Sequence, residues 1–219
     1  MILNLYKPRG ISSFNFINRE KRIQGWKKVG HAGTLDPLAE GVLIVLTDAD
    51  TKRQDEFMKQ DKIYVAEILF GAYSESFDLE KDLTYDLIPP VFSENTLLET
   101  LTNLIGTLSL PAPIYSAKSV GGKRLYKMAK QGISPFELPT VTSTISDIKL
   151  LENTQIELVG KLYPLIKLEI SCSSGTYIRS IANHLGEKLG TKGVLYSLIR
   201  TKVGSFNASD SQKPALNTV

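Results

Sequence analysis

The chain has 219 residues, of which 42% are hydrophobic and 22% charged, a composition typical of a folded globular protein. One cysteine and two histidines exclude an internal disulfide and a metal site of the usual Cys/His spacing. Apolar runs are too short to span a membrane and no signal-peptide layout is seen, so we expect a cytoplasmic protein. The net charge of +3 is too small to indicate a nucleic-acid partner by itself.

The first third of the chain predicts alternating strands and helices. Ile2 to Tyr6 has a strand pattern, and Pro8 and Gly10 indicate a turn after it. Ser12 or Ser13 can cap a helix that runs to about Gln24. We then expect a loop at residues 30–39, a strand at 42–46, a short polar helix at 51–58 and a strand at 63–70.

The rest of the chain predicts an acidic exposed loop at residues 74–90 and then a helix that ends at Gly106. We further expect an extended segment at residues 114–118, a helix at 124–131, and strands at 141–151 and 162–173. A helix at 177–189 and a final strand at 194–206, with Gly204 as a possible bulge, complete the chain. This order predicts the α+β class, with a mixed, largely antiparallel sheet flanked by helices. Residues 1–208 are expected to form one domain, and residues 209–219 a flexible tail.

Charge is distributed unevenly along the chain. The segment from Ala117 to Gly132 holds five basic residues and no acid, whereas residues 75–86 hold five acids and one lysine. A cationic face of this kind favours phosphate binding. A solvated helix face explains the same basic residues equally well.

Residues 30–41 form the most unusual stretch, because they place His31 and Asp36 in a glycine-rich loop before a buried strand. Loops in such positions often carry functional groups. Asp36 precedes Pro37, however, and an Asp-Pro pair is also a common way to open a turn. On the residues alone, the turn is the favoured interpretation.

A second dense stretch, residues 171–179, leads from a strand through small residues into a helix. Amide groups at a helix N-terminus can bind phosphate, and Arg179 in the first turn can bind a carboxylate or phosphate through two nitrogens. A capped helix with a surface arginine is the alternative. Cys172 has the pattern of a core residue rather than a nucleophile.

Together with the N-terminal turn, these stretches closely resemble the TruB family of tRNA pseudouridine synthases. The resemblance spans about residues 1–206 in matching order and spacing. It is carried by Lys-Pro-x-Gly-x-Ser-Ser at 7–13, Gly-His-x-Gly-x-Leu-Asp-Pro-x-Ala-x-Gly-Val-Leu at 30–43, Asp-Lys-x-Tyr at 61–64, Tyr-Ser-Ala at 115–117, Gly-Lys-Arg-Leu-Tyr at 122–126 and Cys-Ser-x-Gly-Thr-Tyr-Ile-Arg at 172–179.

The resemblance implies the pseudouridine synthase fold and an isomerase that converts the T-loop uridine of tRNA, at position 55, into pseudouridine. The reaction breaks the N1 glycosidic bond and rejoins the base through C5, and it implies no metal and no cofactor. Asp36 would be the essential carboxylate, acting on the sugar either as a nucleophile or as a base. Arg179 would pair with Asp36 and keep it ionised, and Tyr64 would stack on the uracil.

The resemblance also implies how the RNA is held. A stacked uridine must be extruded before reaction, and His31 would help to hold the flipped form while Lys7, Tyr177 and Leu198 line the pocket. Recognition would be mostly of RNA shape. The tRNA T-arm would be the partner, with no obligate protein partner and a monomeric enzyme, and its phosphates would contact a basic helix that carries Lys123, Arg124, Lys127 and Lys130.

Several positions depart from the family pattern, and they leave alternatives open. Residues 48–52 keep only Thr51-Lys52 of the usual Gly-x-Ala-Thr-Lys, and residues 198–201 read Leu-Ile-Arg-Thr in place of Leu-Arg-Arg-Thr. No C-terminal PUA-like RNA-binding module is expected. The alternatives are a catalytically weak tRNA-folding chaperone and a synthase that acts on another RNA. A nucleotide-dependent metabolic enzyme is disfavoured because phosphate-loop patterns are missing.

Overall fold

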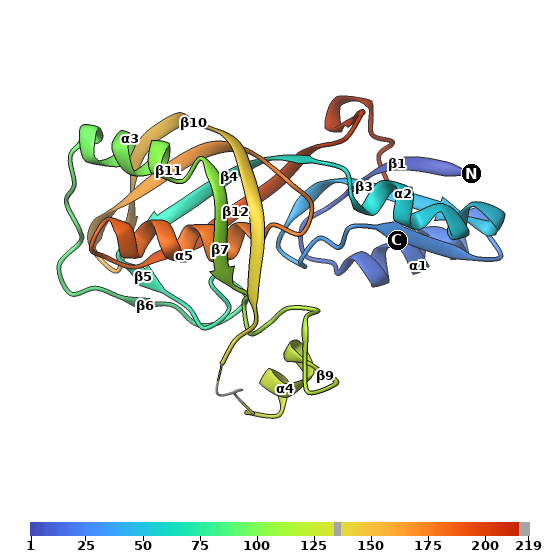
Figure 1. The fold of residues 1–219 in the computed structure, drawn as a ribbon, viewed down its shortest axis with the longest axis horizontal. Helices are drawn as coiled ribbons and strands as arrows, with labels where there is room; N and C mark the ends of the chain where they lie inside the picture. The colour runs from blue at the N-terminus through green and yellow to red at the C-terminus, as the bar shows by residue number, and fades with distance from the viewer. Residues whose placement is uncertain (134–136, 215–219) are drawn as a thin grey trace. The chain divides into compact units, whose positions relative to one another are not determined.

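The computed structural model describes residues 1–133 and 137–214. Their contacts divide the chain into two compact units (Figure 1). The first unit comprises Met1–Val65 and Leu198–Val219, and the second comprises Ala66–Ser197. Strands β4 (Lys62–Phe70) and β12 (Gly193–Val203) each contribute residues to both units.

The first unit is built on strand β3 (Glu40–Thr47). β1 (Ile2–Lys7) and β2 (Val29–Ala32) pair with β3 in antiparallel fashion, whereas β12 pairs with it in parallel. A hairpin joins β12 to β13 (Phe206–Asn207). The helical elements are α1 (Ser13–Gln24), η1 (Asp48–Arg53), α2 (Gln54–Met58) and η2 (Ala208–Asp210).

β3 is buried on both faces because its apolar side chains alternate between two clusters. Val42, Ile44 and Leu46 pack with Ala32, Phe57 and Val203. Leu43 and Val45 pack with Leu5 and with Phe16 and Ile17 of α1. The strand that follows the glycine-rich loop is therefore fixed from both sides, which gives the loop a rigid base.

The second unit contains a sheet with the strand order β4-β11-β10-β7, in which β10 pairs in antiparallel fashion with both neighbours. Helix α5 contacts β7 and α3, and α3 contacts β10. In Figure 1, β9 and α4 lie below this sheet. The elements are β5 (Ala72–Tyr73), β6 (Thr84–Tyr85), α3 (Glu94–Asn103), β7 (Gly106–Pro111), β8 (Ser119–Val120), β9 (Lys123–Arg124), α4 (Leu125–Lys130), β10 (Thr140–Leu158), β11 (Lys161–Cys172) and α5 (Ile178–Lys188).

This architecture confirms the α+β class and a mixed, largely antiparallel sheet. Several local expectations were wrong. Part of the expected loop at 30–39 is strand β2, residues 114–117 are bends, and Gly204 lies in the β12–β13 turn rather than in a bulge. The acidic stretch is not exposed throughout, because Ser74, Ser76 and Asp78 are buried.

The segment after β13 lies along β1, where a flexible tail was expected from residue 209. The Gln212 amide donates to Asn4 O at 2.8 Å, and the Tyr6 amide donates to Gln212 O at 2.9 Å. Ser211 adds a bond to the Asn4 side chain at 2.7 Å. Residues 215–219 of the expected tail lie outside the described residues, and the single catalytic domain over 1–208 stays a prediction.

Gly41 sits where β3 meets β12, with a φ of 109° that favours glycine. An added Cβ would lie 2.2 Å from the Arg200 carbonyl oxygen, so we expect Gly41→Ala to lower the free energy of unfolding by about 3 kcal/mol or more. Gly25→Ala is the control, since Gly25 has a φ of 70° and no neighbour within 4 Å; it should cost only the left-handed strain of about 1 kcal/mol. Urea unfolding measures both, and equal losses would contradict the close approach.

Candidate active site

The loop that carries Asp36 is held by the N-terminal segment of the chain. Ser13 Oγ donates to Leu35 O and accepts from the Leu35 amide, both at 2.8 Å. The Gly10 amide donates to Pro37 O at 2.8 Å. Asp36 therefore lies between two residues whose backbones are fixed. The Ala39 amide donates to Asp36 O at 3.1 Å, so Asp36 also opens the turn that its Asp-Pro sequence predicts.

Lys7 binds the same loop with its ammonium group. The side chain is fully buried, and Nζ donates to Pro8 O, Pro37 O and Ala39 O at 3.0, 3.3 and 2.6 Å. Burial lowers the pKa of Lys7 to about 8, although the charges of Asp36 and Glu40 counteract the shift. Lys7 is therefore still protonated at neutral pH and uses its donors on backbone carbonyls. Its expected place in a substrate pocket stays a prediction.

Arg200 holds the two ends of this loop. Its side chain is 1% exposed, and Nε donates to Val42 O at 2.8 Å while Nη2 donates to Gly33 O at 2.9 Å. Lys7 and Arg200 thus donate to four carbonyls between residues 33 and 42, one of which, Pro37 O, also accepts from the Gly10 amide. The sequence alone marked Arg200 only as a remnant of a family pattern.

His31 lies on β2, opposite Val45 of β3, rather than in a loop. Burial, with a smaller effect of the Arg200 charge, lowers the pKa of His31, so the imidazole is neutral at pH 7. Its Nδ1 atom is buried and has no hydrogen-bond partner among the described residues. A neutral ring of this kind can stack on a base or form a hydrogen bond with it.

Three more of the expected residues belong to the first unit. Asp36 is half-buried, Tyr64 on β4 is 7% exposed, and Leu198 on β12 is 8% exposed. Lys7, His31, Asp36, Tyr64 and Leu198 are thus all carried by one compact unit. Ser13 and Arg200 join them; both lie in the family patterns, but the sequence did not assign either of them to the site.

Substitution of the adjacent residues Ser12 and Ser13 can distinguish an effect on the position of the Asp36 loop from an effect on the stability of helix α1. We expect Ser13→Ala to lower the free energy of unfolding by about 1–3 kcal/mol, because the buried Leu35 amide and carbonyl each lose a partner. Ser12 caps α1 by accepting from the Asn15 amide, so Ser12→Ala should cost about 1 kcal/mol. Only Ser13→Ala should also reduce turnover, measured at saturating RNA. A turnover loss shared by both variants would contradict the role of Ser13.

Arg179 belongs to the second unit and is held in the first turn of α5. Its guanidinium is 3% exposed, and Nη1 donates to Ser76 O and Nη2 to Tyr115 O, both at 3.0 Å. Nε lies 3.7 Å from the carboxylate of Asp78, which is itself buried. Asp78 escaped the sequence search because it lies in the stretch that was expected to be exposed. The pairing of Arg179 with Asp36 stays a prediction.

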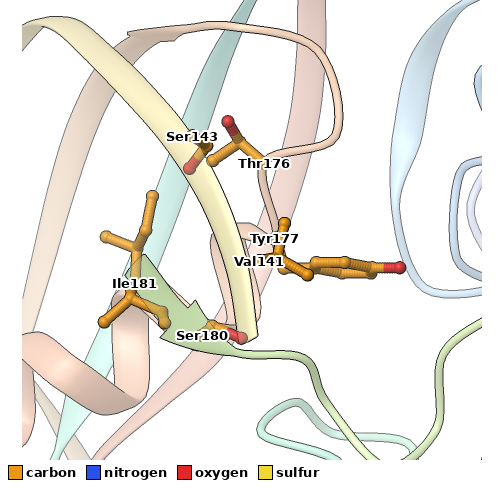
Figure 2. A pocket seen from close by; sticks show the side chains of 7 residues that line it. Val141, Ser143, Thr176, Tyr177, Ser180 and Ile181 are labelled. Carbon is orange, nitrogen blue, oxygen red and sulfur yellow. The ribbon is translucent and has the colours of Figure 1, made fainter. Parts of the chain in front are cut away.

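Tyr177 precedes α5 and borders a small cavity of about 10 Å³ (Figure 2). That volume is at the lower limit for a single water molecule, so the cavity cannot hold a base. Figure 2 shows the Tyr177 ring extending away from the other labelled side chains. The Tyr177 residue is half-buried.

The expected phosphate contacts are all exposed, but they do not share one helix. Lys127 and Lys130 lie on α4, whereas Lys123 and Arg124 lie on β9. Arg124 also donates to Ala117 O, and Leu125, fully buried, anchors the start of α4. The basic residues therefore lie on a β-hairpin and a short helix. The expectation of one basic helix over 123–130 was wrong for residues 123 and 124, which lie on β9.

Within residues 1–133 and 137–214, no cluster of three or more His, Cys, Asp or Glu residues could hold a metal ion. In the same part of the chain, no helix is long and apolar enough to cross a membrane.

Comparison with known proteins gives consistent matches. The family model of the N-terminal domain of the TruB family pseudouridylate synthases matches residues 21–178. The chain is 42% identical over 212 residues to tRNA pseudouridine synthase B of Mycoplasma mobile, which covers 97% of this chain and 71% of the relative. The same-named protein of Parabacteroides distasonis is 38% identical over 221 residues, with coverage of 97% and 89%.

Among solved structures, a chain in the crystal structure of a Cbf5-Nop10-Gar1 complex superimposes with a TM-score of 0.72 at 23% identity. A chain in an H/ACA RNP bound to a substrate RNA that contains 2'-deoxyuridine gives a TM-score of 0.68 at 22% identity. Each match covers 97% of this chain, which spans about half the length of the solved chains. At this identity the likeness shows the fold alone.

Proposed function

Because the chain belongs to the TruB family of pseudouridylate synthases, we propose that it isomerises a uridine of tRNA to pseudouridine. The target is the T-loop uridine, and the T-arm is the part of the tRNA that is bound. The enzyme works as a cytoplasmic monomer without an obligate protein partner, metal or cofactor. The observation that carries the proposal is the fixed position of Asp36, whose neighbours on both sides are held by the N-terminal segment.

Asp36 is the essential carboxylate in this proposal. It either attacks the ribose and forms a covalent intermediate, or removes a sugar proton to give a glycal. Both routes break the bond between the ribose and N1 of uracil, and the base then turns and bonds through C5. The C5 hydrogen leaves as a proton, so the product is an isomer of the substrate.

Arg179 and Tyr64 complete the reaction centre as proposed. Arg179 pairs with Asp36, which keeps the carboxylate ionised and oriented. Tyr64 stacks on the extruded uracil and accepts the C5 proton. Support for a fixed Arg179 comes from its contacts with Ser76, Asp78 and Tyr115 within its own unit.

Substrate binding offsets the cost of extruding the uridine from its stack, which is a few kcal/mol. His31 helps to hold the flipped conformation of the RNA, which suits its neutral, half-buried ring. Lys7, Tyr177 and Leu198 border the uridine pocket. Lys123, Arg124, Lys127 and Lys130 contact phosphates, and these contacts make affinity fall as the salt concentration rises.

The test uses the purified protein and an unmodified tRNA transcript that carries tritium at C5 of its uridines. We expect one tritium to be released per tRNA without added metal or cofactor, and sequencing after chemical labelling should place pseudouridine in the T-loop. Binding without release would favour a folding chaperone. Release from ribosomal or messenger RNA fragments, but not from tRNA, would favour a synthase with another substrate.

A further inference from the structure

Lys62 is a buried lysine that takes no part in the reaction steps proposed above. It is the first residue of β4, and only 5% of it is exposed. Its ammonium group donates to Met58 O at 2.9 Å and also to Gln60 O. Burial of a cation costs free energy, and hydrogen bonds to carbonyls offset only part of that cost. A lysine at this position therefore points to a task beyond filling space.

The two carbonyls that bind Lys62 lie at the end of α2 and just after it, and α2 is fixed to the core of the first unit. Phe57 of α2 packs into the apolar cluster formed by β3. Its ring also meets Phe206 edge to face, with centroids 6.0 Å apart. Carbonyls at the end of a helix lack donors within the helix, and a cation is favoured there. Lys62 thus joins the start of β4 to a helix that is fixed against β3.

The stem of Lys62 lies beside the Asp36 loop at Gly33. A Cβ added to Gly33 would lie 3.9 Å from Lys62 Cε and 3.4 Å from Arg200 Nη1. The φ of Gly33 is 86°, which favours glycine. The Lys62 stem and the Arg200 guanidinium therefore flank the same point of the loop, three residues before Asp36.

Tyr64 follows Lys62 by two residues on β4, so the two side chains project from the same face of the strand. Both residues are buried. Asp61 O accepts from the Gly204 amide at 2.9 Å, and Ile63 O accepts from the Thr201 hydroxyl at 3.2 Å. These two bonds act on the backbone, whereas the Lys62 side chain connects this face of β4 with α2 and with the Asp36 loop.

We propose that Lys62 is a positioning residue, which sets the place of Tyr64 relative to the Asp36 loop. The inference rests on the proposed function, because that function assigns removal of the C5 proton to Tyr64. Asp36 acts on the sugar early in the reaction, and Tyr64 acts on C5 after the base has rejoined. Loss of the Lys62 contacts would therefore slow the later step. A misplacement of about 1 Å can cost about 10²-fold in rate.

The first test compares Lys62→Met with wild type in the release of tritium from C5. Methionine keeps an apolar stem of similar length but has no donor for Met58 O and Gln60 O. We expect kcat to fall by about 10²-fold and KM to stay unchanged, because Lys62 is not placed among the groups that bind RNA. Lys59→Met, at an exposed lysine beside the end of α2, is the control and should change neither. A rise in KM at unchanged kcat would overturn the inference.

Deuterium at C5 of the target uridine identifies the step that is slowed. A bond from carbon to deuterium breaks more slowly than one to hydrogen, so an isotope effect appears when C5 proton removal limits the rate. The ratio of pseudouridine formation rates, hydrogen over deuterium, should be larger for Lys62→Met than for wild type and Lys59→Met. A ratio equal to that of wild type would overturn the inference, because a loss of folded enzyme lowers both rates alike.

Conservative variants separate positioning from folding. Lys62→Arg keeps the cation and its donors, so it should recover most of kcat and the isotope ratio of wild type. If Lys62→Met does not fold, as judged by urea unfolding, Lys62→Gln takes its place, because it keeps a neutral donor, and the same shift of the isotope ratio is expected. Equal losses in Lys62→Arg and Lys62→Met would overturn the role of the donors. Failure of the wild type to release tritium would instead overturn the proposed function.

Discussion

Asp36→Asn is expected to stop tritium release from C5 of the target uridine while RNA binding is retained. A positioned nucleophile or general base contributes about 10²-fold to 10⁶-fold, so single-turnover rates should fall by about 10³-fold or more. Asparagine has the size of aspartate, and the backbone contacts of Leu35, Pro37 and Ala39 that hold the loop are still present in the variant. The loop should therefore keep its shape.

The matched control for this variant is Asp55→Asn, at an exposed carboxylate on α2 in the same unit. It should leave both turnover and affinity unchanged. Filter binding with the unmodified transcript separates affinity from chemistry. Wild-type turnover by Asp36→Asn would remove Asp36 from the mechanism, and a loss of binding equal to the loss of rate would make it a binding residue.

Arg179→Met is expected to lower kcat/KM by about 10²-fold or more, because the proposed mechanism pairs this cation with the Asp36 carboxylate. The same variant should lower the free energy of unfolding by about 3–5 kcal/mol, the usual cost of breaking a buried ion pair from one side. It leaves the buried Asp78 carboxylate without the guanidinium and the Ser76 and Tyr115 carbonyls without a donor.

The double variant Arg179→Met with Asp78→Asn separates these two effects. Removing the Asp78 charge should restore part of the stability, measured by urea unfolding, because no buried carboxylate is left without its cation. Activity should stay low, since Arg179 is still absent. Recovery of both stability and activity would mean that Arg179 acts only by supporting the fold.

Much of the architecture followed from the sequence because local patterns agreed with the fold. The buried strand after the glycine-rich loop, the cap at Ser12 and the end of the first helix at Gln24 are short-range features, and the structure confirms them. Family patterns supplied the site residues themselves. Their assigned roles remain predictions, because bound RNA is needed to define them.

The features that the sequence did not predict depend on contacts between residues that are far apart in the chain. Arg200 is far along the chain from Gly33 and Val42, and only the parallel pairing of β12 with β3 brings it to the loop. Asp78 looked exposed because acidic residues surround it, yet Arg179 draws it into the interior of its unit. Residues 114–117 have the composition of a strand, but they form bends and direct the Tyr115 carbonyl to Arg179.

The hydrogen bonds between residues 7–13 and the Asp36 loop have a consequence for protein engineering. In a chimera that carries residues 30–43 of a relative, the loop backbone would have the conformation that fits that relative's own residues at positions 7 and 13. The contacts that Lys7 and Ser13 make with the loop here would then be altered. The two segments are separated in the chain, but they behave as one module through hydrogen bonds between side chains and backbone. Directed evolution of the loop should therefore vary both segments in a single library.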